Sequence, residues 1–327
     1  MNSYTDKKVL ITGGLGFIGS NLARNLISKG AEVTLVDSLI PEYGGNLFNI
    51  KDIQDKVNVN ICDVRDSFAL THILKNKDYL FNLAGQTSHL DSMANPQTDL
   101  DINVASQISI LEACRKINPD IKIVFASTRQ LYGKPDYLPV DEKHPIRPVD
   151  VNGINKWAGE RYHLLYNDIY GIRACALRLT NTYGAGMRIK DARQTFLGVW
   201  IRLLIEGKPI TIFGDGLQIR DFNYVDDCVS GILLAGLSEA ADGNIFNLGS
   251  PEIINLKTLA ELIVNLGFGG TFELIPFPIE RKVIDIGDYY SDFSFAYKKL
   301  GWQPCIALRE GLLKTINYYQ SNHINYL

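Results

Sequence analysis

The stretch KVLITGGLGFIGSNLARNLISKGAEVTLVD, residues 8–37, decides the fold of this chain. It begins with VLI, a short apolar run of the kind that a buried parallel strand requires. Gly13, Gly16 and Gly19 follow and predict a tight turn, and the amphipathic segment NLARNLIS predicts a helix. A second apolar run, VTLV, ends in Asp37. These segments predict a strand, a glycine turn, a helix and a second strand, in that order.

The glycines and Asp37 together indicate a dinucleotide site. Without side chains at Gly13 and Gly16, backbone N–H groups and the positive end of the helix can meet a pyrophosphate directly, while Gly19 lets the helix lie close to the strand. Asp37 stands eighteen residues after Gly19, where a carboxylate can accept hydrogen bonds from an adenosine ribose. Its charge would repel a 2′-phosphate and residues 38–40 offer no cation, so NAD is favoured over NADP. The alternative is a βαβ unit in which the glycines serve only to form a tight turn and no ligand is bound.

Composition limits the class of protein. A chain of 327 residues with 46% hydrophobic and 21% charged content can bury a sizeable core in one large domain or two. The formal net charge of −3 disfavours nucleic acid as a main partner. The first residues lack the apolar core of a signal peptide, and no later segment approaches about eighteen uninterrupted apolar residues. We therefore expect a cytoplasmic protein that does not contact membranes.

The cysteines and histidines indicate neither disulfides nor a metal. The five cysteines are scattered without a C-x-x-C pair, which is typical of reduced and mostly buried thiols. The five histidines are far apart in the sequence, so no catalytic metal is expected.

Up to about residue 180, predicted strands and helices alternate, which is typical of a doubly wound parallel α/β sheet of the Rossmann type. The predicted strands are residues 9–12, 33–37, 57–62, 79–84, 121–126 and 174–178, and the predicted helices are residues 17–28, 66–74, 96–117 and 152–170. Right-handed crossovers place the carboxyl ends of the strands along one edge, where ligands bind. Residues 13–19, 63–66, 84–89 and 127–133 fall on that edge.

Beyond residue 180 the pattern becomes less regular. Short strands and helices are predicted at residues 192–205, 210–213, 225–237, 245–248, 256–266 and 309–319. They predict a smaller mixed α/β lobe laid over the edge of the sheet. No low-complexity linker separates the lobes, so a closed cleft is favoured over two free domains.

Seven motifs occur in order across nearly the whole chain: TGGLGFIGS, CDVRD, NLAGQ, FASTRQLYG, LRLTNTYG, GDGLQIRDFNYVDD and LGWQP. With these motifs the chain resembles the extended short-chain dehydrogenase/reductases, the nucleotide-sugar epimerases and dehydratases. The resemblance implies an NAD-binding domain at residues 1–180, to which part of residues 223–250 returns, and a lobe at residues 181–327 that mainly binds a nucleotide sugar. It also implies a homodimer paired through the helix of Lys156, to which His163 and Tyr166 could contribute.

The resemblance also implies most of the cofactor site. Asp63 would accept from the adenine amine, with Val64 beside it, although Asp63 could instead cap the end of a strand. Lys156 would bond the nicotinamide ribose. The predicted cofactor-binding residues are Gly13, Gly16, Phe17, Ile18, Gly19, Asp37, Asp63, Val64, Leu83, Ala84, Gly85 and Lys156.

Thr128 falls on the position of the family's catalytic serine or threonine, four residues before Tyr132. Its hydroxyl would donate to and accept from the C4 oxygen of the sugar, although a threonine here could equally cap the following turn. In the 4,6-dehydratases of the family, Asp and Glu follow this residue. Here Arg129 and Gln130 follow, and neither can act as a carboxylic acid. Dehydration by the usual route is therefore disfavoured.

The chain departs from the family where Tyr-x-x-x-Lys is expected. It has Asn152 at the position of the tyrosine, with Lys156 in place, and a carboxamide cannot accept the proton that a phenolate takes. Thr128, a water held by Asn152 and Lys156, His89, Tyr183 or Lys156 itself could take the role of the tyrosine. The remaining alternative is that the protein oxidises slowly or only binds its ligands.

The substrate site implied by the resemblance lies mainly in the second lobe. Asn181 would bond the phosphates or the sugar, and Arg220 would grip the diphosphate, since a guanidinium makes two-pronged bonds to phosphate. Arg188, Lys190, Arg193 and Arg281 add positive charge. The predicted substrate-binding residues are Gln86, Thr128, Arg129, Asn181, Arg193, Arg220 and Arg281, and the predicted catalytic residues are Thr128, Lys156 and Asn152.

These residues predict an NAD-dependent enzyme that oxidises C4 of a nucleoside-diphosphate sugar, with 4-epimerisation favoured. A 4-dehydrogenase or an atypical 4,6-dehydratase are the alternatives among enzymes. A catalytically silent protein that binds NAD and a nucleotide sugar is the alternative from another class.

Overall fold

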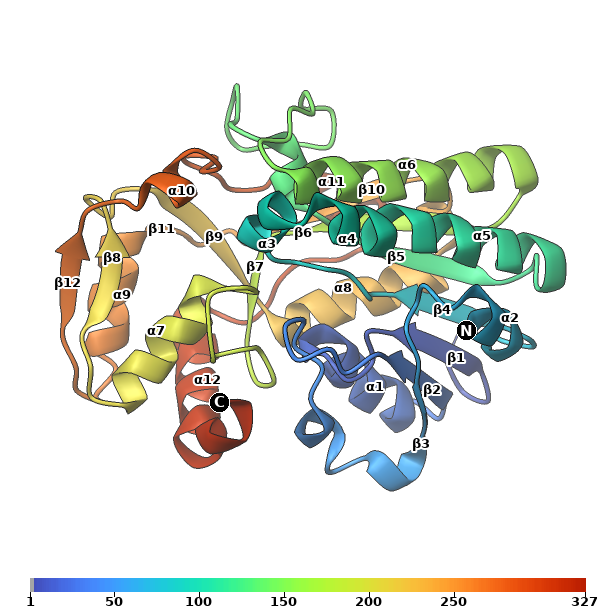
Figure 1. Cartoon of the computed structure of the whole chain (residues 1–327), viewed down its shortest axis with the longest axis horizontal. Coiled ribbons are helices and arrows are strands. Elements are labelled where there is room, and N and C mark those ends of the chain that lie inside the picture. Colours follow the sequence, from blue (N-terminus) through green and yellow to red (C-terminus); the bar gives the residue numbers. More distant parts are fainter. Residues whose placement is uncertain (1–2) are drawn as a thin grey trace.

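The structure is a computed structural model that describes residues 3–327. Its centre is a seven-stranded parallel sheet in the order β10-β6-β5-β4-β1-β2-β3 (Figure 1). The strands are β1 (Lys8–Thr12), β2 (Glu32–Asp37), β3 (Val57–Ile61), β4 (Tyr79–Asn82), β5 (Lys122–Thr128), β6 (Ala174–Leu179) and β10 (Ile245–Leu248). The predicted doubly wound α/β fold is confirmed.

Helices cover both faces of this sheet (Figure 1). One face carries α1 (Phe17–Ser28) and α8 (Val225–Leu237), and the other carries α2 (Ser67–Ile73), α4 (Pro96–Leu100), α5 (Ser106–Ile117) and α6 (Val151–Tyr170). The helix predicted at residues 96–117 is interrupted by a π-helical turn, Asp101–Ala105, whose buried Asn103 lies close to the cofactor site. Such turns are frequent at functional sites.

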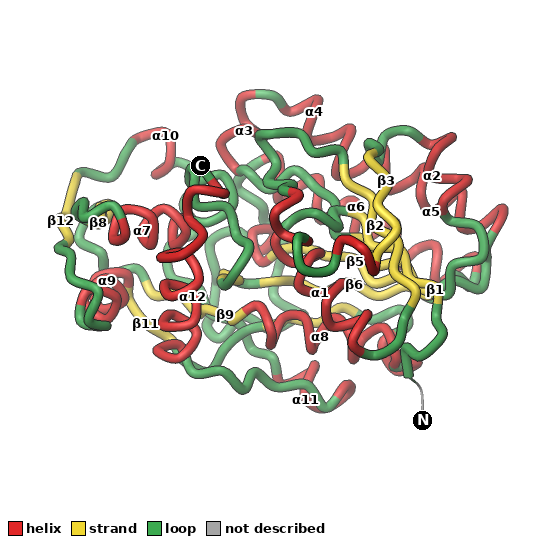
Figure 2. The backbone as a smooth tube through the Cα atoms, turned by 90° about the horizontal axis from the view of Figure 1, so that it is seen from below, coloured by secondary structure: helices red, strands yellow, loops and turns green. Residues whose placement is uncertain are grey.

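The second lobe is built from two small sheets. One contains β11 (Ile253–Asn255), β9 (Ile219–Tyr224) and β7 (Asn181–Tyr183), and the other pairs β12 (Phe272–Ile275) with β8 (Ile210–Phe213). Its helices are α7 (Phe196–Ile205), α9 (Leu256–Val264), α10 (Ile279–Lys282) and α12 (Leu308–Asn322). Helix α11 (Ser294–Leu300) instead packs against β10 and α8 of the large sheet. Figure 2 shows β12, β8 and α9 at one end of the molecule and the large sheet at the other.

Helix α6 brings several site residues to the edge of the sheet. It begins at Asp150, whose carboxylate accepts from the backbone N of Gly153, and it ends at Gly171, which has the left-handed conformation (φ 70°) favoured by glycine. His163 is fully buried in α6 and stacks on Phe125, while the hydroxyl of the buried Tyr166 donates to Glu112. These two residues therefore cannot form a pairing face, contrary to the prediction.

No helix in the described residues is long and apolar enough to cross a membrane. Within residues 3–327 no three His, Cys, Asp or Glu side chains are grouped in a way that could hold a metal ion.

Candidate functional site

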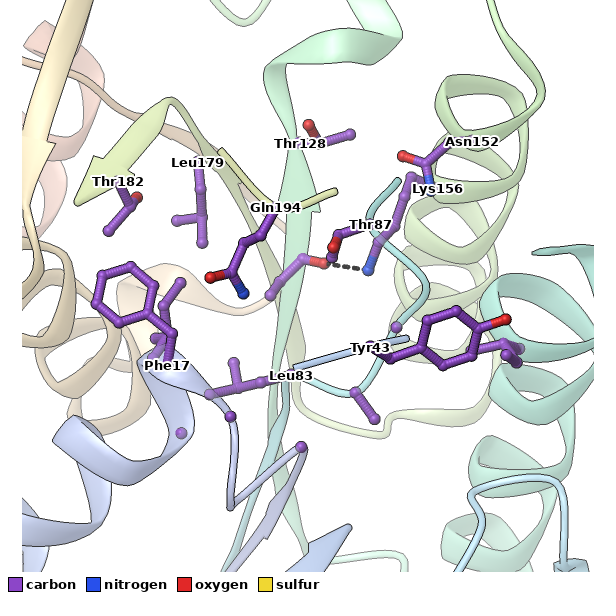
Figure 3. A pocket seen from close by; sticks show the side chains of 18 of the residues that line it. Phe17, Tyr43, Leu83, Thr87, Thr128, Asn152, Lys156, Leu179, Thr182 and Gln194 are labelled. Carbon is purple, nitrogen blue, oxygen red and sulfur yellow. Dashed lines mark hydrogen bonds between the residues drawn. The ribbon is translucent and has the colours of Figure 1, made fainter. Parts of the chain in front are cut away.

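A cleft follows the carboxyl ends of the strands of the large sheet (Figure 3). All twelve residues predicted to bind the cofactor line it, and so do Thr128 and Asn152. Figure 3 shows Thr128, Asn152 and Lys156 near one another, with Phe17 and Leu83 at another part of the cleft. The edge of the sheet thus gathers residues from six separate stretches of the sequence.

The glycine turn forms a cradle that leaves no room for side chains. Gly13 has a φ of 69°, and a Cβ built on Gly19 would lie 2.2 Å from the carbonyl oxygen of Gly13. Gly16, the residue before α1, makes no side-chain cap, so the first N–H groups of this helix are left for a ligand. The cradle fits the pyrophosphate of a dinucleotide.

Asp37 faces the cleft from the end of β2. Its carboxylate accepts from the backbone N of Leu15 at 3.1 Å and of Leu39 at 3.0 Å. Burial raises the pKa of this carboxyl, although the backbone donors oppose the rise. Gly45 passes so close that a Cβ there would lie 2.5 Å from Oδ1 of Asp37. The carboxylate is therefore fixed where a ribose of the cofactor can reach it.

Asp63 is held by a partner that the sequence did not reveal. The Nε and Nη2 atoms of Arg65 donate to its two oxygens at 2.9 and 2.7 Å. The side-chain hydrogen bonds from Arg65 lower the pKa of Asp63 and keep it charged. Oδ1 also accepts from the backbone N of Arg65 at 2.8 Å, so the second lone pair of Oδ2 is the one left for an adenine amine.

Lys156 reaches the cleft from the buried side of α6. Its Nζ donates to the carbonyl oxygen of Ala126 at 3.0 Å, and burial lowers its pKa to about 8. A Cβ at Gly85 would lie 2.9 Å from Nζ and equally close to Oδ1 of Asn103, so a side chain at residue 85 would collide with both. The Oδ1 atom of Asn103 is buried and has no hydrogen-bond partner in the described chain. This unpaired acceptor is a further feature that fits a bound cofactor.

Thr128 both caps the turn that follows it and faces the cleft. Its Oγ1 accepts from the backbone N of Gln130 at 3.2 Å, which caps a short 3₁₀ turn, and the side chain also lines the cleft. The hydroxyl proton of Thr128 has no acceptor in the described chain and can be donated to a ligand oxygen. The Nε2 atom of Gln130 donates to Asp150 at 2.9 Å. Gln130 therefore occupies the position at which the family's 4,6-dehydratases have their glutamate, and its amide is hydrogen-bonded to Asp150.

Asn152 is fixed by two buried acceptors. Its Nδ2 donates to the backbone oxygen of Gln86 at 2.8 Å and to Oδ2 of Asp99 at 3.0 Å, while Asn155 donates to the other oxygen of Asp99 at 2.8 Å. Because both partners are acceptors, they identify Nδ2 as the inward atom and leave Oδ1 as the atom available to a ligand or water. The asparagine can hold a proton donor in place but cannot take its proton.

Tyr183 and His89, which were considered as replacements for the tyrosine, lie in different surroundings. Tyr183 is 1% exposed, its hydroxyl donates to the backbone oxygen of Leu308, and it lines neither cavity of the site. His89 lines the cleft, with its Nδ1 3.0 Å from Oδ2 of Asp150.

A second cavity opens from the first towards the smaller lobe. The residues that line both are His89, Arg129, Gln130, Asn181, Gln194 and Thr195. The second cavity also contains Arg193, Arg220 and Arg281. The structure thus brings six of the seven predicted substrate-binding residues to these two connected cavities.

The cations of the second cavity differ in how they are neutralised. Arg193 pairs with Asp91 and Asp191, and Arg220 lies 3.3 Å from Asp285. Arg129 and Arg281 make no ion pair among residues 3–327. They are therefore the charges left for a ligand.

Arg129 is held in place without a carboxylate. Its Nη2 donates to Oδ1 of Asn181 at 2.8 Å, its guanidinium stacks over Tyr289, and its Nη1 is buried without a partner in the described chain. Burial lowers the pKa of Arg129, which shows the cost of a cation without a counter-ion at this position.

The predicted role of Gln86 is not supported by its position. The residue is 2% exposed and lines neither cavity. Its Nε2 donates to the backbone oxygen of Ser88, and its own backbone oxygen accepts from Asn152 and Asn103. Gln86 therefore supports the wall of the site from behind.

Several residues of the cleft were missed because irregular loops deliver them. They are Tyr43 and Gly45 after β2, and Gln194 and Thr195 before α7. Figure 3 shows Gln194 reaching into the cleft, beside residues that are distant from it in the sequence. No local pattern in the sequence marks these loop positions.

A model of the NAD dependent epimerase/dehydratase family matches residues 9–249. The chain is 37% identical over 318 residues to a putative UDP-glucose 4-epimerase of Methanocaldococcus jannaschii, a match that covers 96% of this chain and 99% of that protein. This chain belongs to the NAD dependent epimerase/dehydratase family.

Solved structures agree with this assignment. A UDP-glucose 4-epimerase of Thermotoga maritima, solved with UDP-glucose, matches with a TM-score of 0.89 and 29% identity, over 97% of this chain and 99% of that one. The UDP-glucose 4-epimerase of Thermus thermophilus, solved with NAD, matches with a TM-score of 0.86 and 26% identity, over 96% and 99% of the two chains. The family consists of NAD-dependent enzymes that act on nucleotide sugars.

Proposed function

We propose that this protein binds NAD in the first cavity and oxidises C4 of a nucleoside-diphosphate sugar held in the second, and that it acts as a 4-epimerase. NAD supplies a hydride acceptor when bound. The chain supplies the glycine cradle and Asp37 for the adenosine half, Lys156 for the nicotinamide ribose, and Thr128 for the C4 oxygen. Re-reduction of the ketone on its opposite face inverts C4 and leaves the cofactor unchanged.

The unpaired cations of the second cavity carry this proposal. Buried charges are normally paired, so Arg129, whose Nη1 is buried without a partner in the described chain, requires an anionic ligand, and the half-buried Arg281 adds a second unpaired cation to the same cavity. A nucleotide diphosphate supplies such an anion and reaches from the small lobe to Thr128. The replacement of both dehydratase acids by Arg129 and Gln130 favours epimerisation over dehydration.

The test is to incubate the purified protein with NAD and UDP-, GDP-, CDP- or dTDP-sugars. We expect a new 4-epimer without lasting reduction of the cofactor. Lasting reduction would indicate a 4-dehydrogenase instead. Thermal stabilisation by both ligands without any turnover would indicate a binding protein and would contradict the proposal.

Replacing Arg281 by glutamine should weaken binding of the nucleotide sugar by about 10- to 100-fold, because a hydrogen bond to a charged group contributes roughly 1.5–3 kcal/mol. Binding of NAD should not change, since Arg281 lines only the second cavity. Calorimetric titration with each ligand measures both effects. Arg147→Gln, which removes an exposed partner of Asp136, is the control. Equal affinities of the variant and the wild type would show that the diphosphate does not reach Arg281.

We also propose a homodimer formed through α6. Although His163 and Tyr166 are buried, another face of this helix exposes the large apolar side chains Ile154, Trp157, Leu165 and Ile169. Their spacing of three or four residues, or multiples of it, places them along one stripe. Light scattering should give twice the mass of the chain, and Leu165→Glu together with Ile169→Glu should give monomers. A monomeric wild type would contradict the proposal.

A further inference from the structure

We infer that His89 is the general base and acid of this site, with Asp150 as the carboxylate that orients it. The inference rests on the proposed C4 oxidation and names the group that takes the place of the family tyrosine. Asn152 stands at the position of that tyrosine, and its amide has no basic atom for the proton of an alcohol.

The position of His89 suits the task. It is the first residue of α3 (His89–Ala94), and it lines both cavities where they join. Its side chain is 38% exposed, so a ligand can reach the ring. The cofactor side of the site and the sugar side therefore meet at this imidazole.

The two nitrogens of His89 are distinguished by Asp150. Nδ1 lies within ion-pair distance of Asp150, 3.0 Å from Oδ2, but the ring does not point its Nδ1–H at that oxygen, and this buried nitrogen has no hydrogen-bond partner in residues 3–327. At this distance a rotation of the imidazole ring is enough to bring an Nδ1 proton onto the carboxylate oxygen. In the neutral ring the proton is then on Nδ1, and Nε2 keeps the lone pair that a base needs.

Asp150 is built to remain an ionised carboxylate. Its side chain is fully buried, and it accepts from the backbone N of Gly153 at 2.7 Å and from Nε2 of Gln130 at 2.9 Å. Burial alone would raise its pKa, but His89, Gly153 and Gln130 together lower it. The carboxylate can therefore stabilise the imidazolium when His89 takes a proton, as a carboxylate does in other His–Asp pairs.

The other candidate bases are less suitable. The hydroxyl of Tyr183 is engaged with Leu308 outside the cleft. Lys156 donates from Nζ to the carbonyl oxygen of Ala126, and a pKa of about 8 leaves most of it protonated at pH 7. Thr128 can relay a proton, but a neutral hydroxyl needs a base behind it. His89 is the cleft residue that combines a free lone pair with a carboxylate partner.

The chemical step balances with these groups and a bound NAD. NAD would accept the hydride from C4 and would give it back to the opposite face. As the C4 alcohol becomes a ketone, Nε2 of His89 would take the O4 proton directly or through Thr128, and Asp150 would stabilise the imidazolium. When the alcohol forms again, Nε2 would return this proton to O4.

The first test compares His89→Gln with the wild type. Glutamine keeps a polar side chain of similar reach but has no basic nitrogen. The rate of hydride transfer should fall by about 10²- to 10⁴-fold, with little change in the affinity for the nucleotide sugar. Free imidazole should partly restore the rate of His89→Ala, which a merely structural role would not allow. His72→Gln, on the exposed side of α2, is the control.

The second test does not depend on turnover. Long-range ¹H–¹⁵N spectra of the protein at mildly alkaline pH should show His89 as the Nδ1–H tautomer. Asp150→Asn should convert it to the Nε2–H tautomer and slow hydride transfer, because an amide donor would then face Nδ1. Asparagine caps a helix as well as aspartate does, so α6 should keep its start and the thermal stability should change little.

Wild-type rates in His89→Gln, or an Nε2–H tautomer of His89 in the wild type, would overturn the inference. If the wild type oxidises no nucleotide sugar, the proposed function fails, and the role of His89 fails with it. If the wild type oxidises a sugar and His89→Gln does so equally well, only the inference fails.

Discussion

Replacing Glu160 by glutamine should lower the free energy of unfolding by about 3–5 kcal/mol, the usual cost of removing one partner of a buried ion pair. Glu160 and Arg178 are 0% and 1% exposed, and they are joined by bonds of 2.6 and 3.0 Å. Burial lowers the pKa of Arg178, but Glu160 and Tyr132 outweigh this effect and raise it overall, so the guanidinium stays charged. Glutamine would leave that charge without a counter-ion.

The same change should disturb the site. Glu160 accepts from Oγ of Ser127 at 2.7 Å, and Ser127 immediately precedes Thr128 in β5. Urea unfolding measures the stability, and Glu310→Gln, which removes an exposed ion-pair partner on α12, should change it little. The double variant Glu160→Leu, Arg178→Met should be more stable than Glu160→Gln, because it leaves no unpaired charge. A loss of less than about 1 kcal/mol in Glu160→Gln would contradict this account of the core.

Replacing Gly19 by alanine should weaken NAD binding by about 10- to 100-fold, in line with the roughly 1–3 kcal/mol that overpacking costs. The new Cβ would lie 2.2 Å from the oxygen of Gly13 and 2.9 Å from Cα of Gly14. Both are backbone atoms that cannot rotate away, so α1 must move off the turn and its N–H groups must leave the pyrophosphate.

Calorimetric titration with NAD measures the loss of affinity in Gly19→Ala. Ser28→Ala, at the exposed end of the same helix, should bind NAD as the wild type does. Unchanged affinity in the Gly19 variant would show that the close approach of α1 to the turn is not needed for binding.

The first half of the fold could be predicted because its local signals agree. Apolar runs, the glycine turn and amphipathic periodicity all point to β1, α1 and β2, and the helix predicted at residues 17–28 has these bounds in the structure. The cofactor residues followed from the same order, since parallel strands bring their carboxyl ends to one edge.

The smaller lobe was harder to predict because its strands depend on distant partners. Strand β9 contains the charged pair Arg220 and Asp221, which reads as a loop in the sequence. In the fold Arg220 reaches Asp285, while Asp221 accepts from Thr180 and from the backbone N of Ser291. Such long-range contacts make these buried charges tolerable, and no local pattern shows them.

The pairing of His89 with Asp150 has the same origin. The residues are 61 positions apart, and only the packing of α3 against the start of α6 brings them together. The sequence indicates that a base is missing at Asn152, but it gives several candidates for the replacement. The structure removes one of these candidates, because Tyr183 lies outside the cleft and its hydroxyl is bonded to Leu308.

The central claim is that C4 of a nucleotide sugar faces a bound nicotinamide. A nucleoside-diphosphate sugar labelled with deuterium at C4 tests it most directly. We expect a primary isotope effect and a 4-epimer that keeps its deuterium, because the same hydride returns to the carbon from which it came. Loss of the deuterium to solvent during epimerisation would contradict the account. Equal rates for the labelled and unlabelled sugars, with no reduction of the cofactor at any stage, would also contradict it.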